Sequence, residues 1–313
     1  MATPSETLAR SITRSGNDHA YTTIRLLADR RLTADAFRAY AYFRWVDDRL
    51  DLGEFNRPAA QAFLTRQNQL IGAAYRGRRL PAQEPEENLL LDLLRRDRDP
   101  VGGLALYIRN LMEVMTFDTA RRGRWISAEE LSGYTRRLAL GVTEALHYFI
   151  GGRPATPSPA RHLAAAGAHV AHMLRDTRED VARGYFNIPR EALQAADLTP
   201  EQFDHPSYLA WVRRRVEQAR RCLRLGRLYL VQIDNLRFRV AGLAYCLRFE
   251  ECLDVIESEG FRVPEPAISA PRRRRPLGVF APALLAAIRR QGRSATLSTY
   301  SGRSARAKGS DPA

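Results

Sequence analysis

The sequence predicts an all-α fold, a bundle of roughly eight to ten helices around a central cavity. No segment alternates apolar and polar residues with the β-branched composition and flanking turns that strands require. Helix-start signals recur along the chain instead. With 313 residues, 45% of them hydrophobic, the chain is long enough to bury one large core.

The first clear helix-start signal is Thr33, which precedes the apolar and aromatic segment 34–51. Ser127 and Glu130 form a capping-box pattern ahead of the segment 131–151. In such a box, each side chain bonds the backbone N–H of the other residue, so the first turn of the helix is stabilised.

Further start signals follow in the second half of the chain. Ser158 precedes Pro159, a cap residue before a proline at the first helical position, and this pair predicts a helix over 160–184. Thr199 and Gln202 form a second capping-box pattern. Two long helices are expected after it, over 206–234 and 236–260.

The breaks between these segments are short and rich in Gly and Pro, so none of them marks a domain boundary. We therefore expect a single domain over residues 1–290. The Ser-, Gly- and Arg-rich residues 291–313 have the composition of a basic, disordered tail.

The composition also bounds where the protein works. Three cysteines without a Cys-x-x-Cys pattern are too few for a disulfide framework, so a reducing compartment is expected. The N-terminal segment lacks the apolar run of a signal peptide, and no stretch reaches the ~18 apolar residues of a membrane span. We expect a cytoplasmic protein.

The net charge of +14 is concentrated at the C-terminal end, where the last 43 residues hold ten basic residues and one acid. This end could form a peripheral contact with the inner face of an anionic membrane, or it could be a solvated basic terminus. Its apolar part, 276–288, could instead pack as the last helix of the fold. The rest of the chain is only mildly basic, so nucleic-acid binding is not expected.

Two Asp-x-x-x-Asp pairs carry most of the functional information: Asp47 with Asp51, and Asp176 with Asp180. Residues i and i+4 share one face of a helix, about 6 Å apart along its axis. Two such helices that face each other would form an oxygen-rich site for hard divalent cations. Mg²⁺ prefers one or two carboxylates together with water and phosphate oxygens. The pattern therefore favours Mg²⁺ bound with the diphosphate of a substrate.

Both pairs lie in apolar segments rather than in the polar surroundings of most chance pairs. Tyr40 and Arg44 share the helix face of the first pair, and the apolar run 165–174 precedes the second pair. Carboxylates in such surroundings lose their hydration unless they pair with cations or bind metal. This placement argues against a surface ion-pair role.

With these motifs the chain resembles the squalene and phytoene synthases. FRWVDDRLD (43–51) is similar to the family's first aspartate-rich motif, and GAHVAHMLRDTREDVARGYFNIP (167–189) is similar to the second. The stretch between them, 113–142, contains Asp118 and Tyr134 at corresponding places. The segment 244–261 resembles the family's late helix, so the likeness extends over most of the chain.

The resemblance implies an isoprenoid-synthase helical bundle and a Mg²⁺-dependent transferase. Enzymes of this family join two identical prenyl diphosphates of C15 or C20 head to head, lose diphosphate through a carbocation, and supply carotenoid or hopanoid precursors. By matching position, the metal ligands would be Asp47, Asp51, Asp176 and Asp180. Arg44 and Arg175 would neutralise diphosphate. Tyr40 and Tyr134 would contact leaving oxygens or shape the cavity.

The second motif departs from the family pattern at two histidines. His169 and His172 stand where the family has glutamine and asparagine, and His172 lies four residues before Asp176 and so faces the site. We expect both histidines to bind diphosphate, with metal ligation, proton acceptance or inert packing as alternatives for His172. Imidazole favours softer ions than Mg²⁺, so Mn²⁺ is also a candidate metal.

Other departures concern the pocket and the end of the second motif. Leu140 and Thr143 add bulk to the family's glycine-bearing central helix, which would change the shape of the pocket. Tyr185 and Asn187 replace an arginine and a tyrosine, so one diphosphate contact is expected to be lost.

Three functions stay open on these grounds. The first is head-to-head condensation of two prenyl diphosphates. The second is a class I terpene cyclase or a prenyl diphosphate hydrolase that ionises one substrate, and the third is a non-catalytic family member. No Gly-x-Gly-x-x-Gly segment follows a strand, so the sequence does not reveal whether NADPH takes part.

Overall fold

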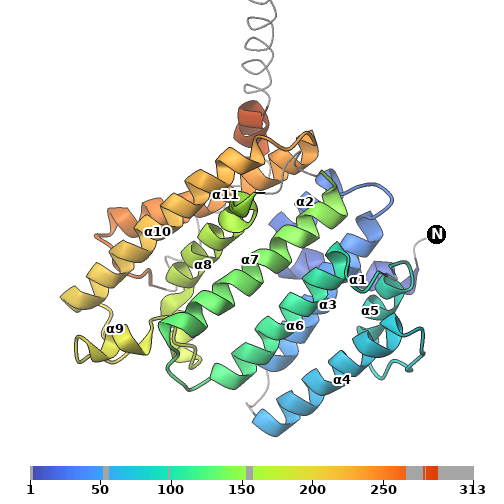
Figure 1. The fold of residues 1–313 in the computed structure, drawn as a ribbon, viewed down its shortest axis with the longest axis horizontal. Coiled ribbons are helices and arrows are strands. Elements are labelled where there is room, and N and C mark those ends of the chain that lie inside the picture. The colour runs from blue at the N-terminus through green and yellow to red at the C-terminus, as the bar shows by residue number, and fades with distance from the viewer. Residues whose placement is uncertain are drawn as a thin grey trace, which may run out of the picture.

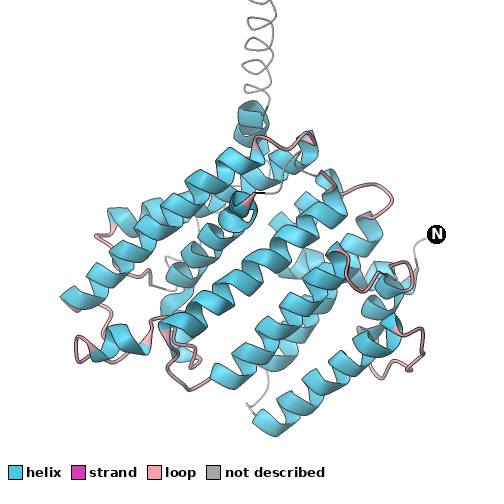
Figure 2. Cartoon of the chain, in the orientation of Figure 1, coloured by secondary structure: helices cyan, strands magenta, loops and turns pink. Residues whose placement is uncertain are grey.

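Helices make up most of the described structure. The computed structural model describes residues 3–51, 56–97, 99–152, 158–265, 278 and 280–287. Over these residues the chain forms eleven α-helices, one 3-10 helix and a further helical segment at 280–287, with no strand (Figures 1 and 2). The all-α prediction is confirmed.

The first half of the chain contains α1 (Pro4–Gly16), α2 (Asp18–Leu27), α3 (Thr33–Asp51), α4 (Arg57–Tyr75), α5 (Glu87–Leu94) and α6 (Gly103–Arg121). The second half contains α7 (Ala128–Ile150), the 3-10 helix η1 (Pro159–His162), α8 (Leu163–Ala182), α9 (Arg190–Gln194), α10 (Pro206–Leu230) and α11 (Leu236–Ser258). There are more helices than expected, because short elements such as α5 and α9, with 8 and 5 residues, give no long periodic pattern.

Most helix-start signals act as the sequence predicts. α3 begins at Thr33, and the capping box before α7 is complete. In it, the Ser127 hydroxyl accepts from the Glu130 N–H at 3.1 Å, and Glu130 accepts from the Ser127 N–H at 2.7 Å. These bonds satisfy two backbone donors that the first turn of a helix leaves free.

Two signals act differently from the prediction. Ser158 and Pro159 begin the 3-10 helix η1, and the α-helix itself starts at Leu163. Thr199 and Gln202 make one bond of a capping box, from the Thr199 N–H to Gln202 Oε1 at 2.7 Å, but no helix follows within the next residues. The next helix, α10, starts at Pro206, where the proline needs no hydrogen-bond partner for its nitrogen.

The helices pack around two apolar cores. α1, α3, α5 and α6 supply much of one core, which includes Phe37, Tyr42 and Ile108. α8, α10 and α11 supply much of the other, which includes Leu174 and Val216. α7 lies between α6 and α8 in Figure 1 and contacts both helices. The two aspartate pairs therefore come from helices of different cores.

α8 and α10 approach each other closely at two glycines. A Cβ atom added to Gly167 would lie 2.8 Å from the Ala219 carbonyl oxygen, and one added to Gly226 would overlap the backbone of Ala164. Only glycine leaves room for backbones at this separation. The close packing holds α8, which carries the second aspartate pair, against the longest helix of the bundle.

The helical segment 280–287 packs against α11. Ala283 and Ala287 are buried there, in a small cluster with Val240, Leu243 and Ala244. This contact favours packing as a last helix over the membrane alternative for that segment. The expected tail 291–313 and the run of four arginines at 272–275 lie outside the described residues, and the bounds of a single domain stay a prediction. None of the described helices is both long and apolar enough to span a bilayer.

Replacing Gly226 by alanine is expected to lower the free energy of unfolding by about 1–3 kcal/mol, because the new methyl group would overlap the backbone of Ala164. Gly133→Ala in α7 is the matched control. Its added Cβ would meet the flexible end of Arg137, and the change should be neutral or stabilising because it removes a glycine from a helix interior. Urea denaturation measures the free energy of unfolding of both variants. Equal changes in the two variants would show that the close contact of α8 and α10 at Gly226 does not matter for stability.

Candidate active site

A polar cavity of about 680 Å³ opens between the cores, at the C-terminal ends of α3 and α8. All ten side chains that the sequence singled out for a functional role line it: Tyr40, Arg44, Asp47, Asp51, Tyr134, His169, His172, Arg175, Asp176 and Asp180. The two aspartate pairs are far apart in the sequence and face the same space. Their individual roles stay predictions.

The first pair carries negative charge that the protein does not fully balance. Burial, followed by repulsion from Asp51, raises the pKa of Asp47 to about 7. Arg44 is expected to neutralise diphosphate, but here its guanidinium binds Asp48, with Nη2 2.6 Å from Oδ1 and Nε 3.0 Å from Oδ2. A ligand that reached Arg44 would therefore share it with Asp48.

The two aspartates of the second pair have pKa values shifted in opposite directions. Burial and then repulsion from Asp176 raise the pKa of Asp180 to about 7. Burial also acts to raise the pKa of Asp176, but hydrogen bonds from Arg175 and His172 outweigh it and hold this pKa well below its ordinary value. Arg175 contacts both oxygens of Asp176, and His172 Nε2 lies 2.8 Å from Oδ2. Asp176 is thus already neutralised, whereas Asp180 is not.

Asp118 links the two pairs electrostatically, although the sequence pointed to it only as a matching position without a role. Its charge raises the pKa of both Asp47 and Asp180, which places it near both pairs. Arg121 Nε binds Asp118 Oδ1 at 2.5 Å, and the Tyr134 hydroxyl donates to Asp118 Oδ2 at 3.0 Å. Arg121 was missed, because an arginine in an arginine-rich chain gives no signal by itself.

Tyr185 and Asn187 hold the aspartates in place, whereas the sequence suggested that these replacements would lose a diphosphate contact. The Tyr185 hydroxyl donates to Asp51 Oδ1 at 3.0 Å, so it connects the end of the second motif to the first pair. Asn187 Nδ2 donates to Asp180 Oδ2 at 2.7 Å, and its Oδ1 accepts from Arg121 at 2.9 Å. These contacts depend on tertiary proximity, and no local pattern encodes them.

The carboxylates fit a metal that brings part of its own coordination shell. Among the described side chains, no group of three or more His, Cys, Asp or Glu is close enough to hold one ion. Mg²⁺ commonly takes one or two carboxylates and completes its shell with water and phosphate oxygens. Asp47 with Asp51, and Asp180, meet that requirement. Asp176 and His172 are bonded to each other. A hydrogen-bonded carboxylate and the second ring nitrogen of a histidine can still bind a metal, so the role of these two residues as ligands stays a prediction.

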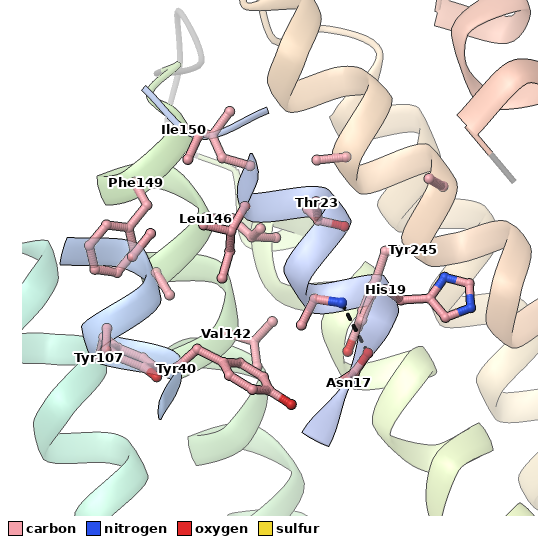
Figure 3. Close-up of a pocket in the computed structure, with 18 of the residues that line it drawn as sticks. Asn17, His19, Thr23, Tyr40, Tyr107, Val142, Leu146, Phe149, Ile150 and Tyr245 are labelled. Atoms are coloured by element: carbon pink, nitrogen blue, oxygen red, sulfur yellow. Dashed lines mark hydrogen bonds between the residues drawn. The ribbon is translucent and has the colours of Figure 1, made fainter. Parts of the chain in front are cut away.

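An apolar pocket of about 320 Å³, drawn in Figure 3, shares lining residues with the polar cavity. Tyr40, Tyr107, Val142 and Tyr245 line both spaces, so the one continues into the other. The wall of the apolar pocket consists largely of side chains from α2, α3, α7 and α11, among them Leu146, Phe149 and Ile150. Neither Leu140 nor Thr143 lines either space, whereas their neighbour Val142 does. The expected effect of these two residues on pocket shape is therefore at most indirect.

His169 is the most deeply buried of the predicted diphosphate-binding residues, with 6% of its surface exposed. Burial, followed by the charges of His172 and Arg121, keeps its pKa well below the ordinary value. The ring is therefore neutral. A neutral imidazole offers little attraction to a diphosphate compared with Arg44 or Arg175.

Comparisons with known proteins agree with the fold and with the motifs. A dehydrosqualene synthase in complex with ligand superposes with a TM-score of 0.69 at 15% identity, over 89% of this chain and 95% of the other. Squalene synthase HpnC from Alicyclobacillus acidocaldarius superposes with a TM-score of 0.65 at 20% identity, over 82% of this chain and 95% of the other. At these identities the likeness shows a shared helical isoprenoid-synthase fold.

No curated protein matches the chain significantly in sequence. The squalene/phytoene synthase family model, by contrast, matches residues 13–278. That range includes both aspartate pairs, Asp118, and the apolar pocket except for Phe280. The chain belongs to the squalene/phytoene synthase family.

Proposed function

We propose that this protein joins two prenyl diphosphates head to head, with loss of diphosphate, in the cavity between α3 and α8. The observation that carries the proposal is the convergence of two aspartate pairs on one polar cavity that continues into an apolar pocket. The polar part suits a diphosphate and the apolar part suits a hydrocarbon chain. Membership of the family supports a prenyl-transferring activity of this type.

The polar cavity would bind and ionise the diphosphate end. When bound, Mg²⁺ would act as a Lewis acid that stabilises the departing diphosphate. Asp47, Asp51 and Asp180 would hold the metal, and Arg44 and Arg175 would add positive charge near the leaving oxygens. Arg44 binds Asp48 and Arg175 binds Asp176, so a diphosphate would share each arginine with a carboxylate.

The apolar pocket would bind the prenyl chain and keep water from the carbocation. Tyr40 and Tyr107 lie at the junction of the two spaces and are labelled in Figure 3. Aromatic faces at this position can stabilise an allylic cation through their π electrons. Exclusion of water from the same place would prevent hydrolysis of the cation.

An enzyme that ionises a single prenyl diphosphate is the second candidate. The neutral, buried His169 in the cavity wall suits this reaction as well, because such a group can end the reaction of one cation by removing a proton. The product would then be a cyclic or linear terpene, or an alcohol if water were the acceptor.

The product formed from a prenyl diphosphate separates these functions. Purified protein is incubated with Mg²⁺ and either the C15 or the C20 diphosphate, and the organic extract is identified by mass spectrometry. A C30 or C40 hydrocarbon, or its cyclopropyl diphosphate precursor, is expected, and a chelator should abolish it. A C15 or C20 terpene or alcohol would favour the second candidate, and no turnover of either substrate would contradict both.

Removing the Tyr185 hydroxyl is expected to weaken the metal site. Tyr185→Phe deletes the hydrogen bond to Asp51, so the Mg²⁺ concentration for half-maximal activity should rise about 10–100-fold. Tyr42→Phe is the matched control, because it deletes a buried tyrosine hydrogen bond to Gln67 outside the cavity. A Mg²⁺ titration of both variants checks this expectation. An equal response to Mg²⁺ would show that Tyr185 acts only on stability.

The stability of the metal-free protein should depend on pH through Asp47 and Asp180. Both pKa values are about 7 in the folded protein, against an ordinary value of 3.8. Between these two pH values, Asp47 and Asp180 hold more protons in the folded protein than in the unfolded chain. The free energy of unfolding should therefore fall as the pH rises from 3.8 to about 7. Unfolding is measured at pH 5 and at pH 8 with a chelator present. The decrease in the free energy of unfolding from pH 5 to pH 8 should be smaller in Asp180→Asn than in the parent. An equal decrease in the two proteins would contradict a raised pKa at Asp180.

A further inference from the structure

His169 lines the polar cavity, and both of its ring nitrogens are buried without a hydrogen-bond partner. It lies in the N-terminal half of α8, seven residues before Asp176, and neither Nδ1 nor Nε2 has a hydrogen-bond partner. A buried polar atom without a partner loses its hydration and gains nothing in return. Such an arrangement persists where a bound ligand or a reaction step uses the group.

The surroundings keep this imidazole neutral. Burial is the main reason that the pKa of His169 is lowered, and the positive charges of Arg121 and Arg215 act in the same direction. Its ring packs against Tyr134, with 5.1 Å between the ring centroids and 58° between the planes. A neutral ring has one N–H group and one nitrogen with a free lone pair. His169 therefore holds a base in a water-poor part of the cavity.

Other groups in the cavity wall are less suited to accept a proton from a hydrocarbon cation. His172 binds Asp176 and its side chain is 50% exposed. The Tyr134 hydroxyl donates a hydrogen bond to Asp118, and burial raises the pKa of Tyr134 well above its usual value. Asp176 is neutralised by Arg175. His169 thus combines a free lone pair with a place in the wall of the reaction cavity.

We propose that His169 accepts the proton that ends a carbocation step in this cavity. This inference rests on the proposed prenyl-diphosphate chemistry and identifies the residue that determines whether the cation becomes an alkene, a cyclopropane or an alcohol. A C–H bond breaks on the carbon next to the cationic carbon to give an alkene, or on the following carbon to give a cyclopropane. Its electron pair forms the new carbon–carbon bond, and the proton binds the free ring nitrogen. No oxidant or reductant is needed.

The proton would not stay on His169. An imidazolium at this position would lie near the positive charges of Arg121 and Arg215, which disfavour it. The diphosphate released in the same cavity has anionic oxygens that can take the proton. The low basicity of the His169 ring does not hinder proton transfer from the carbocation, because a carbocation is a far stronger acid than an imidazolium. His169 would thus pass the proton on and be ready for the next turnover.

The test separates release of diphosphate from the identity of the product. His169→Gln keeps a polar side chain of similar length but removes the base. Diphosphate release should stay within about threefold of the parent, whereas the deprotonated product should fall on the order of 100-fold in favour of alcohol. His162→Gln, at a histidine that lines neither space, is the matched control and should leave both readouts unchanged.

A second variant guards against misfolding. His169→Gly removes the ring, and free imidazole should restore the deprotonated product in proportion to its concentration, while His169→Gln should not respond. An unchanged product ratio in His169→Gln, or a parallel loss of diphosphate release and product that imidazole does not restore, would overturn the assignment. If the parent released no diphosphate from any prenyl substrate, the proposed function itself would fail, which is a different result.

Discussion

Buried negative charge that the protein compensates only in part is the constraint around which this structure is organised. Asp47, Asp118 and Asp180 come from α3, α6 and α8, and burial and mutual repulsion raise all three of their pKa values. Such an arrangement costs free energy, and packing elsewhere has to hold it. The two apolar cores and the glycine contacts between α8 and α10 supply that packing. A bound cation would relieve the repulsion among these aspartates, so cation binding would recover the free energy that their burial costs.

A network of hydrogen bonds orients the acids around this cavity. Arg121 bonds both Asp118 and Asn187, and Asn187 bonds Asp180. Tyr185 reaches Asp51 across the cavity, so α3 and the segment after α8 are tied at the site. Departures from the family pattern at Tyr185 and Asn187 thus maintain the orientation of the carboxylates. The departure at His169 is of another kind, because it adds a base that has no partner in the protein.

Much of the fold could be predicted because its signals are local. The capping box of Ser127 and Glu130 acts within a few residues, and the aspartates of each pair share a face because of helix geometry alone. Thr199 shows the limit of such signals. Its partner Gln202 makes the expected bond, yet the helix starts only at Pro206. A capping pattern stabilises a first turn where the chain packs as a helix, and it does not create that packing.

The order of residues already predicts the helical class, the position of both aspartate pairs and the chemistry that two such pairs favour, because these follow from spacing along one helix. Which charges are balanced depends on how the helices pack together. This packing joins Asp176 to Arg175 and His172, brings Asp118 near both pairs and leaves the nitrogens of His169 unpaired. The physical reason is that pairing and desolvation depend on neighbours from distant parts of the chain, which no local pattern records.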